Sequence, residues 1–166
     1  MRIRWHHSVL LLTSIAAAPA QLWAQQAATH EPQTVLFVCE HGTVKSLLAK
    51  VLFEEYAAEV GLRVRAESRG TRADSVVPPW MQQGLAADHI TLGSWRPQTL
   101  RQVDLAKASY VVSFDVPSSA TAATQAPRVQ WDSLPSVSKD YSSGRDAIKA
   151  RVHQLVDSLK RALPKR

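Results

Sequence analysis

Residues 35–46 read VLFVCEHGTVKS, and this stretch decides the fold. Its first five residues form a continuous apolar run of strand length, which is typical of a strand buried on both faces in a parallel sheet. From Lys45 to Val60 apolar residues recur mostly every three or four positions, and Gly61 follows as a C-cap. The sequence therefore predicts a strand, a short loop and a helix that begins at Lys45.

Strands and helices continue to alternate after this unit. Further strands are predicted at 62–67, 110–115 and 128–131, and further helices at 78–87, 99–108 and 141–163. Strands that alternate with helices predict an α/β fold with a doubly wound parallel sheet. We expect about four parallel strands in a three-layer arrangement, with helices on both faces of the sheet.

The N-terminal residues read MRIRWHH followed by SVLLLTSIAAAPA, a basic region before an apolar run. The run is shorter than the roughly 18 to 20 residues that span a bilayer, so residues 1–24 are predicted to be a secretory signal peptide. We expect cleavage after Ala24, with Ala20 as second choice; an uncleaved N-terminal anchor is the alternative. Residues 25–33 then form a flexible lead-in to one domain at 34–166, located in the bacterial periplasm without stable membrane insertion.

The charge balance excludes some classes of partner. Removing residues 1–24 takes away Arg2 and Arg4, so the 20 basic and 14 acidic residues become 18 and 14, a net charge of about +4. No stripe of Lys and Arg with interleaved aromatic residues is present, which argues against nucleic acid and suits a small anionic substrate. The histidines show no metal-ligand spacing, so no metal and no other cofactor is expected.

The chain has one cysteine, which excludes an intramolecular disulfide. A solitary thiol in a secreted protein is buried as a small apolar residue, paired with another chain, or used chemically. In a doubly wound sheet the ligand site lies at the carboxyl ends of the strands. Four residues with chemical potential sit at or just beyond predicted strand ends, and we expect them to gather on one edge: Cys39, Arg69, Asp115 and Asp132.

The loop after Cys39 has the form of an anion cradle. A loop between a strand and a helix N-terminus turns backbone N–H groups inward, and the helix dipole adds partial positive charge. The same field stabilises a thiolate, so Cys39 is predicted to be a nucleophile at neutral pH. Ser46 is placed to donate a hydrogen bond to the sulfur, Lys45 to set a charge against bound oxygens, and His41 to add to the field when protonated.

These residues resemble a known family. The run VLFVCEHGTVKSLLAKVLFEEYA is similar to the phosphate loop of low-molecular-weight protein tyrosine phosphatases, whose pattern is C-x5-R-S after a strand. AESRGTRADSVVPPWMQQGL resembles that family's S-A-G-T segment and following helix, and VDLAKASYVVSFD resembles its strand that ends in Met-Asp. The likeness covers most of residues 34–163.

The resemblance implies that Cys39 takes the phosphoryl group as a phosphocysteine and that Ser46 helps the thiolate leave. It also implies that the loop backbone holds the three equatorial oxygens, which makes the substrate-binding residues Glu40, His41, Gly42, Thr43 and Val44. The same fold hosts thiol-dependent arsenate reductases, but those need two further cysteines that this chain lacks.

Three departures from the family pattern bear on activity. Lys45 stands where the family has Arg, and an ammonium cannot grip two phosphate oxygens in a planar fork. Arg69, where the family has a small residue, is expected either to supply the missing guanidinium or to be a solvated loop arginine. His41 and Gly42 replace the family's Gly-Asn, in which the asparagine braces the loop.

The third departure concerns the general acid. The family supplies it as the Asp of an Asp-Pro pair, and here WDSLPSVSKDY has Leu134 before the proline. Asp132 is our first candidate, Asp140 the second and Asp115 the third. Asp140 is equally well placed to be the N-cap of the last helix, and Asp115 matches a structural aspartate of the family.

The sequence thus predicts an exported, cysteine-dependent phosphatase whose substrate is a phosphorylated protein, as the resemblance implies, or a small phosphate ester. The alternative in the same fold is an oxyanion-binding module in which Lys45 and Leu134 have ended turnover. A third hypothesis is a redox-active or intermolecularly disulfide-linked thiol protein.

Overall fold

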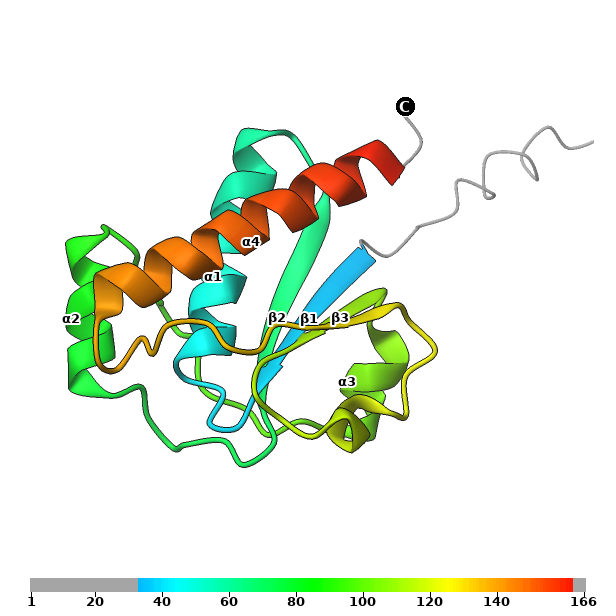
Figure 1. Ribbon diagram of the computed structural model, residues 1–166, viewed down its shortest axis with the longest axis horizontal. Coiled ribbons are helices and arrows are strands. Elements are labelled where there is room, and N and C mark those ends of the chain that lie inside the picture. The colour runs from blue at the N-terminus through cyan, green and yellow to red at the C-terminus, as the bar shows by residue number, and fades with distance from the viewer. Residues whose placement is uncertain (1–32, 163–166) are drawn as a thin grey trace, which may run out of the picture. The chain divides into compact units, whose positions relative to one another are not determined.

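A computed structural model describes residues 33–162 of the chain (Figure 1). The predicted signal peptide and residues 25–32 of the lead-in lie outside the described residues. Among the described helices, none is both long and apolar enough to cross a membrane. The elements are, in chain order, β1 (Gln33–Cys39), α1 (Lys45–Glu59), β2 (Val64–Gly70), α2 (Pro79–Ala87), α3 (Gln102–Lys107), β3 (Tyr110–Ser113), the 3-10 helix η3 (Ser118–Thr121), β4 (Arg128–Gln130) and α4 (Tyr141–Ala162).

The four strands form one parallel sheet in the order β2-β1-β3-β4. This confirms the predicted fold class. The register runs Cys39 against Gly70 on one side of β1 and Val38 against Ser113 on the other, so the carboxyl ends of the three strands meet at one edge. The functional residues predicted at strand ends are therefore brought to that edge, as a doubly wound sheet requires.

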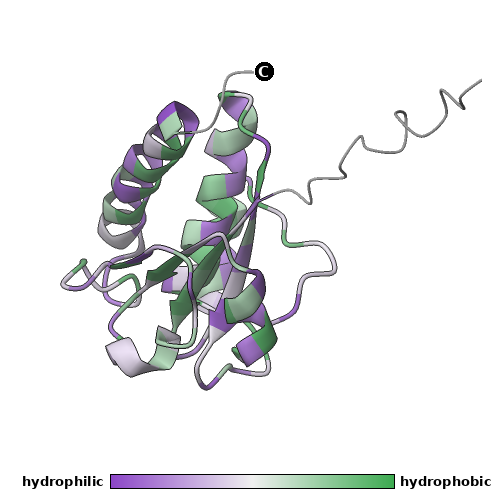
Figure 2. Ribbon diagram, turned by 90° about the vertical axis from the view of Figure 1, so that its right-hand side faces the viewer, coloured by the Kyte–Doolittle hydropathy of each residue, from purple (hydrophilic) through white to green (hydrophobic). Residues whose placement is uncertain are grey.

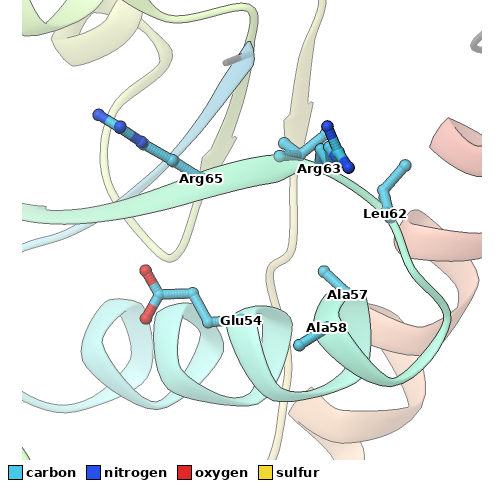
Figure 3. Close-up of a pocket in the computed structure, with 7 residues that line it drawn as sticks. Glu54, Ala57, Ala58, Leu62, Arg63 and Arg65 are labelled. Carbon is cyan, nitrogen blue, oxygen red and sulfur yellow. The ribbon is translucent and has the colours of Figure 1, made fainter.

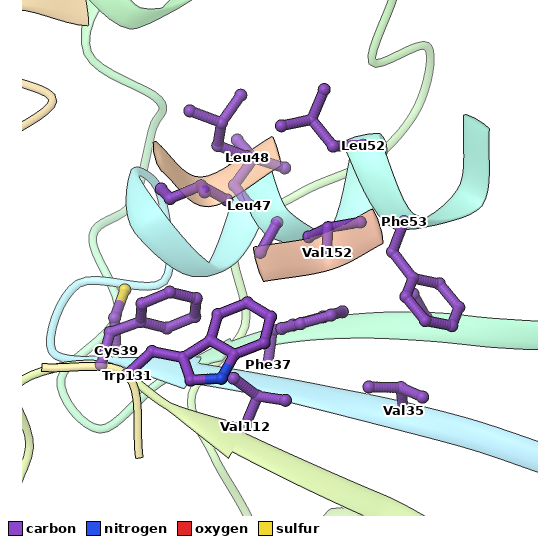
Figure 4. Packing of buried hydrophobic residues seen from close by; sticks show 14 of the residues in the cluster. Val35, Phe37, Cys39, Leu47, Leu48, Leu52, Phe53, Val112, Trp131 and Val152 are labelled. Carbon is purple, nitrogen blue, oxygen red and sulfur yellow. The ribbon is translucent and has the colours of Figure 1, made fainter. Parts of the chain in front are cut away.

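Side chains of β1 alternate between two cores, one on each face of the sheet. Phe37 and Cys39 face the larger core with α1 and α4, where Phe53 and Trp131 pack on Phe37 (Figure 4). Leu36 and Val38 face a smaller core with Leu105 of α3. Figure 2 shows the apolar character concentrated in the central strands, as expected of a sheet covered on both faces.

The second strand differs from its prediction by several residues. Leu62 belongs to the turn that ends α1, because its N–H donates to the carbonyl of Ala57 at 2.7 Å. At its other end β2 continues to Gly70, because the parallel register with β1 holds as far as Cys39. The residues SRGT, predicted to form a turn after the strand, therefore lie largely inside it.

The other boundaries move less. Gln33, predicted to be the end of the lead-in, is the first residue of β1, and β3 ends at Ser113 because Asp115 adopts a left-handed conformation with φ 48°. The short helix predicted at 99–108 begins only at Gln102, since Thr99 pairs with Gly70 at the edge of the sheet. The helix predicted to open at Pro78 and Pro79 and to run to Ala87 forms as α2, with Pro78 as its N-cap residue.

Candidate active site

The loop between β1 and α1 has its carbonyl groups turned away from the cradle and bonded to the segment after β2. The carbonyls of Cys39, Glu40 and His41 accept from the N–H groups of Thr71, Arg72 and Asp74 at 2.9, 2.8 and 3.0 Å. The N–H groups of His41, Thr43 and Val44 have no hydrogen-bond partner within residues 33–162. The loop therefore offers donors and hides acceptors, as an anion site requires.

Helix α1 adds its own open end to the loop. Its N-cap residue, Val44, makes no side-chain hydrogen bond to the first turn. The first-turn N–H groups of a helix have no partner within the helix and carry partial positive charge. An apolar N-cap leaves them available, so the N-terminus of α1 faces the same ligand position as the loop.

Two glycines allow this loop to lie close against the end of β2. Gly42 has φ 71°, and a Cβ on it would meet the backbone nitrogen of Gly70 at 2.7 Å. A Cβ on Gly70 would meet the backbone of Gly42 and His41 at 2.8 Å. Side chains at either position would push the loop away from the strand.

The cysteine lies at the floor of the cradle with two polar partners. Its Sγ is 3.0 Å from Ser46 Oγ and accepts from the Gly42 N–H at 3.2 Å. The Gly42 N–H donates to the sulfur, and in the contact with Ser46 either atom can be the donor. Cys39 is only 7% exposed, and Figure 4 places it at the end of the larger core cluster. The predicted nucleophile and its serine are thus brought together.

Ser68 of β2 completes this group and was not singled out by the sequence. It is fully buried, and its Oγ lies within hydrogen-bond distance of Ser46 Oγ at 2.9 Å and of the Gly42 carbonyl at 3.0 Å. A proton given by Ser68 to Ser46 leaves the Ser46 proton for Cys39. The serine of the AESRGT stretch was the available signal, but its role depends on the register between β1 and β2.

Asp74 is a second residue that sequence reasoning missed. Its carboxylate lies 3.0 Å from His41 Nδ1 and accepts from Thr43 Oγ1 at 2.9 Å, while Glu40 pairs with Arg72 at 2.5 Å. The side chains of the loop therefore point toward residues 72–74 and the backbone faces the cradle. The brace that the His41-Gly42 departure put in question is supplied by Asp74.

The remaining predicted residues form a chain of contacts at the ends of β3 and β4. Lys45 Nζ makes an ion pair with the Asp115 carboxylate. The Asp115 N–H donates to Asp132 Oδ1 at 3.0 Å, and Gln130 Nε2 donates to Asp132 Oδ2 at 2.7 Å. Lys45, Asp115 and Asp132 are brought together, but the two carboxylates are engaged with the protein itself.

The structure does not bring the Arg69 guanidinium to the loop. Ser68 and Arg69 both lie within β2, where successive side chains point to opposite faces, so Ser68 faces the cradle and Arg69 faces the opposite side of the sheet. There it is 7% exposed and donates to Glu67 at 2.9 Å and to Asp104 of α3 at 3.2 Å. The position expected for Arg69 is corrected accordingly, and neither the solvated loop arginine nor the phosphate-binding guanidinium is seen.

This buried ion pair changes the titration of its carboxylate. Burial by itself would raise the pKa of Asp104, but hydrogen bonds from Arg101 and Arg69 outweigh it, and the pKa lies below the usual value. The cluster therefore ties α3 to β2 through a charged carboxylate at neutral pH.

Asp140, the second candidate for the general acid, also has a hydrogen-bond partner in the protein. The Asp140 Oδ1 accepts the Ser143 N–H at 3.1 Å, which is the contact of an N-cap residue of α4. Leu134 packs against the larger core, and Val137 is 1% exposed against Gly144 of α4. The assignment of the acid to Asp132 stays a prediction.

Two hollows lie apart from the cysteine. A pocket of about 340 Å³ opens between the C-terminal half of α1 and the start of β2, lined by Glu54, Arg63 and Arg65 among others (Figure 3). It is at the end of β2 opposite to Gly70, and thus far along the strand from Cys39. A second hollow, of about 820 Å³, lies between α2 and the loop 88–97. Among the described residues no group of three or more metal-ligating side chains is found.

Known structures with this fold include phosphatases and arsenate reductases. YfkJ from Bacillus subtilis superimposes with a TM-score of 0.72 at 18% identity, over 82% of this chain and 99% of that one. A thioredoxin-dependent arsenate reductase from Corynebacterium glutamicum gives 0.66 at 20% identity, over 84% and 68%. The arginine phosphatase YwlE gives 0.66 at 21% identity, over 77% and 96%; YwlE is from Bacillus subtilis.

Comparison of the sequence with known proteins gave one negative and one positive result. No curated protein matches the chain. A family model described as low molecular weight phosphotyrosine protein phosphatase matches residues 34–132, which include the cradle, both neighbouring strands and Asp132. The predicted family is confirmed: the chain belongs to the low molecular weight phosphotyrosine protein phosphatase family.

Proposed function

We propose that the protein hydrolyses phosphate compounds, phosphate monoesters included, through a phosphocysteine formed on Cys39. One observation carries this proposal: the sulfur lies between two donors, Ser46 and Gly42, at the floor of a loop that presents unpaired N–H groups. A buried cysteine that only filled space would not need an open helix end and free donors above it.

In the proposed reaction the thiolate attacks phosphorus, the S–P bond forms and the P–O bond to the leaving group breaks. The loop N–H groups and the N-terminus of α1 hold the three equatorial oxygens, whose charge is largest in the transition state. Water then attacks phosphorus, the S–P bond breaks, and the Ser46 hydroxyl stabilises the departing thiolate. Lys45 contributes a point charge to phosphate binding, shared with Asp115.

The arginine phosphatase YwlE, which shares the fold, supports a covalent route. A cysteine-to-serine mutant of that enzyme carries a phosphorylated active site serine. By analogy we place the phosphoryl group on Cys39, with a phosphorylated protein or a small phosphate ester as the substrate.

The test is hydrolysis of p-nitrophenyl phosphate by residues 25–166 and by the same chain with Cys39→Ser, with reductant and chelator present. The range from about pH 5 to about pH 8 brackets the titrations expected of a thiolate mechanism. Chelator-resistant hydrolysis that is lost in Cys39→Ser supports the proposal. Equal hydrolysis by both proteins contradicts it.

A second candidate function is an oxyanion-binding module, which the Lys45–Asp115 ion pair and the buried side of Leu134 favour. The two functions separate in one experiment, calorimetric binding of tungstate together with turnover. Tight tungstate binding without turnover of p-nitrophenyl phosphate would identify the module. A disulfide-linked thiol protein would instead show a Cys39-dependent dimer on non-reducing electrophoresis.

We also propose that the protein is exported to the periplasm, on the basis of its N-terminal sequence alone. The mass of the protein recovered from a periplasmic extract distinguishes cleavage after Ala24 from cleavage after Ala20. Recovery of the full-length chain in the membrane fraction would favour an uncleaved anchor.

A further inference from the structure

Residues 68–74, at the end of β2 and just after it, hold the cradle loop from behind. The Ser68 Oγ donates to the Gly42 carbonyl at 3.0 Å, and the backbone of Gly70 lies so close to Gly42 that a Cβ on either glycine would collide. Three carbonyls of the loop accept from backbone N–H groups of this segment at 2.8 to 3.0 Å. The position of residues 68–74 therefore sets the position of the loop donors, and we call this segment the scaffold of the cradle.

Arg69 belongs to the scaffold, but its side chain lies on the other face of the sheet. It is 7% exposed there, and its guanidinium donates to Glu67 at 2.9 Å, to the Ser68 carbonyl at 2.9 Å and to Asp104 at 3.2 Å. Asp104 is in α3, which Figure 1 shows on the side of the sheet opposite to α1. One buried guanidinium therefore joins the scaffold to a helix behind the sheet.

The carboxylate that receives Arg69 is itself fixed. Asp104 accepts from the Arg101 N–H at 2.9 Å. Although burial raises the pKa of Asp104, hydrogen bonds from Arg101 and Arg69 bring it below the usual value, so its carboxylate is charged at neutral pH. Beside this pair the N–H and the carbonyl of Gly70 are bonded to the backbone of residues 98 and 100 at 3.0 and 2.8 Å. The segment 98–104 thus holds the scaffold through the Gly70 backbone and the Arg69 side chain.

Packing alone does not explain an arginine at this position, where the family has a small residue. The Arg69 Nε is buried and has no hydrogen-bond partner within residues 33–162. A buried donor without an acceptor lowers stability, and a buried ion pair often contributes no more than apolar residues of the same volume. The bonds of a guanidinium are directional, however, and fix one segment against another in a way that an apolar side chain does not.

We propose that Arg69 is a positioning residue that, paired with Asp104, holds residues 68–74 where the loop donors converge on a bound oxyanion. This role rests on the proposed function, because it concerns the same cradle, and it adds a residue from the opposite face of the sheet. Arg69 does not touch the oxyanion and acts through its neighbours Ser68 and Gly70. A displacement of about 1 Å is enough to weaken a set of converging groups.

The first test is amide hydrogen exchange in the folded protein, which needs neither turnover nor a ligand. Arg69→Met keeps an apolar side chain of similar length and removes every guanidinium donor. It is expected to speed exchange of the amides of residues 71, 72 and 74, whose acceptors are loop carbonyls, at least about threefold, with the amides of α4 unchanged. Leu105→Ala is the matched control, because it removes buried apolar contacts of the same helix and leaves the ion pair in place. Equal acceleration in both variants would overturn the inference.

The second test is the Kd for tungstate, which a role confined to stability would leave unchanged. Calorimetry is done at a temperature at which circular dichroism shows each variant to be folded. Arg69→Met is expected to raise the Kd at least about threefold and Leu105→Ala to leave it unchanged. An unchanged Kd in Arg69→Met would overturn the inference even if exchange were faster. Wild-type protein that binds no tungstate would contradict the proposed function instead, and the exchange rates would then decide whether Arg69 holds the scaffold.

A double variant tests the pairing with Asp104. If the two residues act as a unit, Arg69→Met with Asp104→Asn should raise the Kd no more than Arg69→Met alone. Full additivity of the two single effects would overturn the pairing. The double variant also removes both charges, so it replaces Arg69→Met if that variant does not fold with an unpaired Asp104. Wild-type exchange and Kd in the double variant would overturn the inference.

Discussion

The two halves of the site differ in how closely they match the family pattern. The cradle, from Cys39 to Ser46 with the segment after β2, has its donors facing inward and its carbonyls bonded outward. The segment from Asp115 to Asp140 instead pairs its carboxylates with the protein and packs Leu134, partly buried, against the larger core. In the proposed mechanism, binding of phosphate and attack on phosphorus therefore depend on different residues from protonation of the leaving group.

The cradle depends most on one backbone position. Gly42→Ala is expected to abolish phosphatase activity and to destabilise the fold by about 1 to 3 kcal/mol, because its Cβ meets Gly70 and its φ is left-handed. Gly61→Ala is the matched control, since Gly61 has the same φ of 71° with nothing within 4 Å of its Cβ. Chemical denaturation and p-nitrophenyl phosphate assays measure both. Equal effects of the two substitutions would show that strain alone, and not the close approach, matters.

Asp74, which braces the loop of the cradle, is expected to have the next largest effect on activity. Asp74→Ala removes the acceptor of Thr43 Oγ1 and the partner of His41. We expect kcat/KM to fall by about tenfold or more, because a displaced donor set loses transition-state stabilisation. Asp157→Ala is the control: it removes a carboxylate that accepts from Tyr56 between α1 and α4, away from the loop. Similar losses in both variants would argue that Asp74 acts on general stability only.

Lys45 connects the two halves, and its removal should weaken oxyanion binding without abolishing it. Lys45→Ala is expected to raise the Kd for tungstate by about tenfold, equivalent to about 1.4 kcal/mol. Lys50→Ala is the matched control on the same helix, since Lys50 pairs with Glu54 at 2.6 Å. Calorimetry of both variants measures the effect. An unchanged Kd in Lys45→Ala would mean that Asp115 neutralises the lysine completely.

The smallest expected effect lies on the other face of the sheet, where Arg69 holds Asp104. Because the folded pKa of Asp104 is lowered, its stabilisation is present above its unfolded pKa of about 3.9 and is lost as the pH falls through the folded value. The stability difference between the wild type and Asp104→Asn should therefore shrink as the pH falls from about 5 to below the unfolded pKa of about 3.9. Urea denaturation across this range measures it, and a constant difference would contradict the assignment.

Much of the architecture was predictable because it depends on local patterns. The apolar run before Cys39, the three- and four-residue spacing after Lys45 and the two prolines before α2 determine those elements, and they form where predicted. The meeting of strand ends then follows from a parallel sheet. For the same reason Cys39, Ser46, Lys45 and the two aspartates after β3 and β4 could be expected at one edge.

What could not be predicted depends on register and on contacts between distant segments. The length of β2 decides which of two neighbouring residues faces the cradle, and a one-residue difference exchanges Ser68 for Arg69. Asp74 lies 31 positions from Thr43 and acts only because the segment after β2 runs beside the loop. No spacing rule along the chain identifies such a brace.

The central claim is that Cys39 takes the phosphoryl group, and one measurement tests it most directly. The chain of residues 25–166 is mixed with dinitrophenyl phosphate, quenched during the first turnover and digested. The mass of the peptide that contains Cys39 is then measured by mass spectrometry. The account predicts one added phosphoryl group on Cys39 and none in Cys39→Ala. Rapid release of dinitrophenol with an unmodified Cys39 peptide would contradict it.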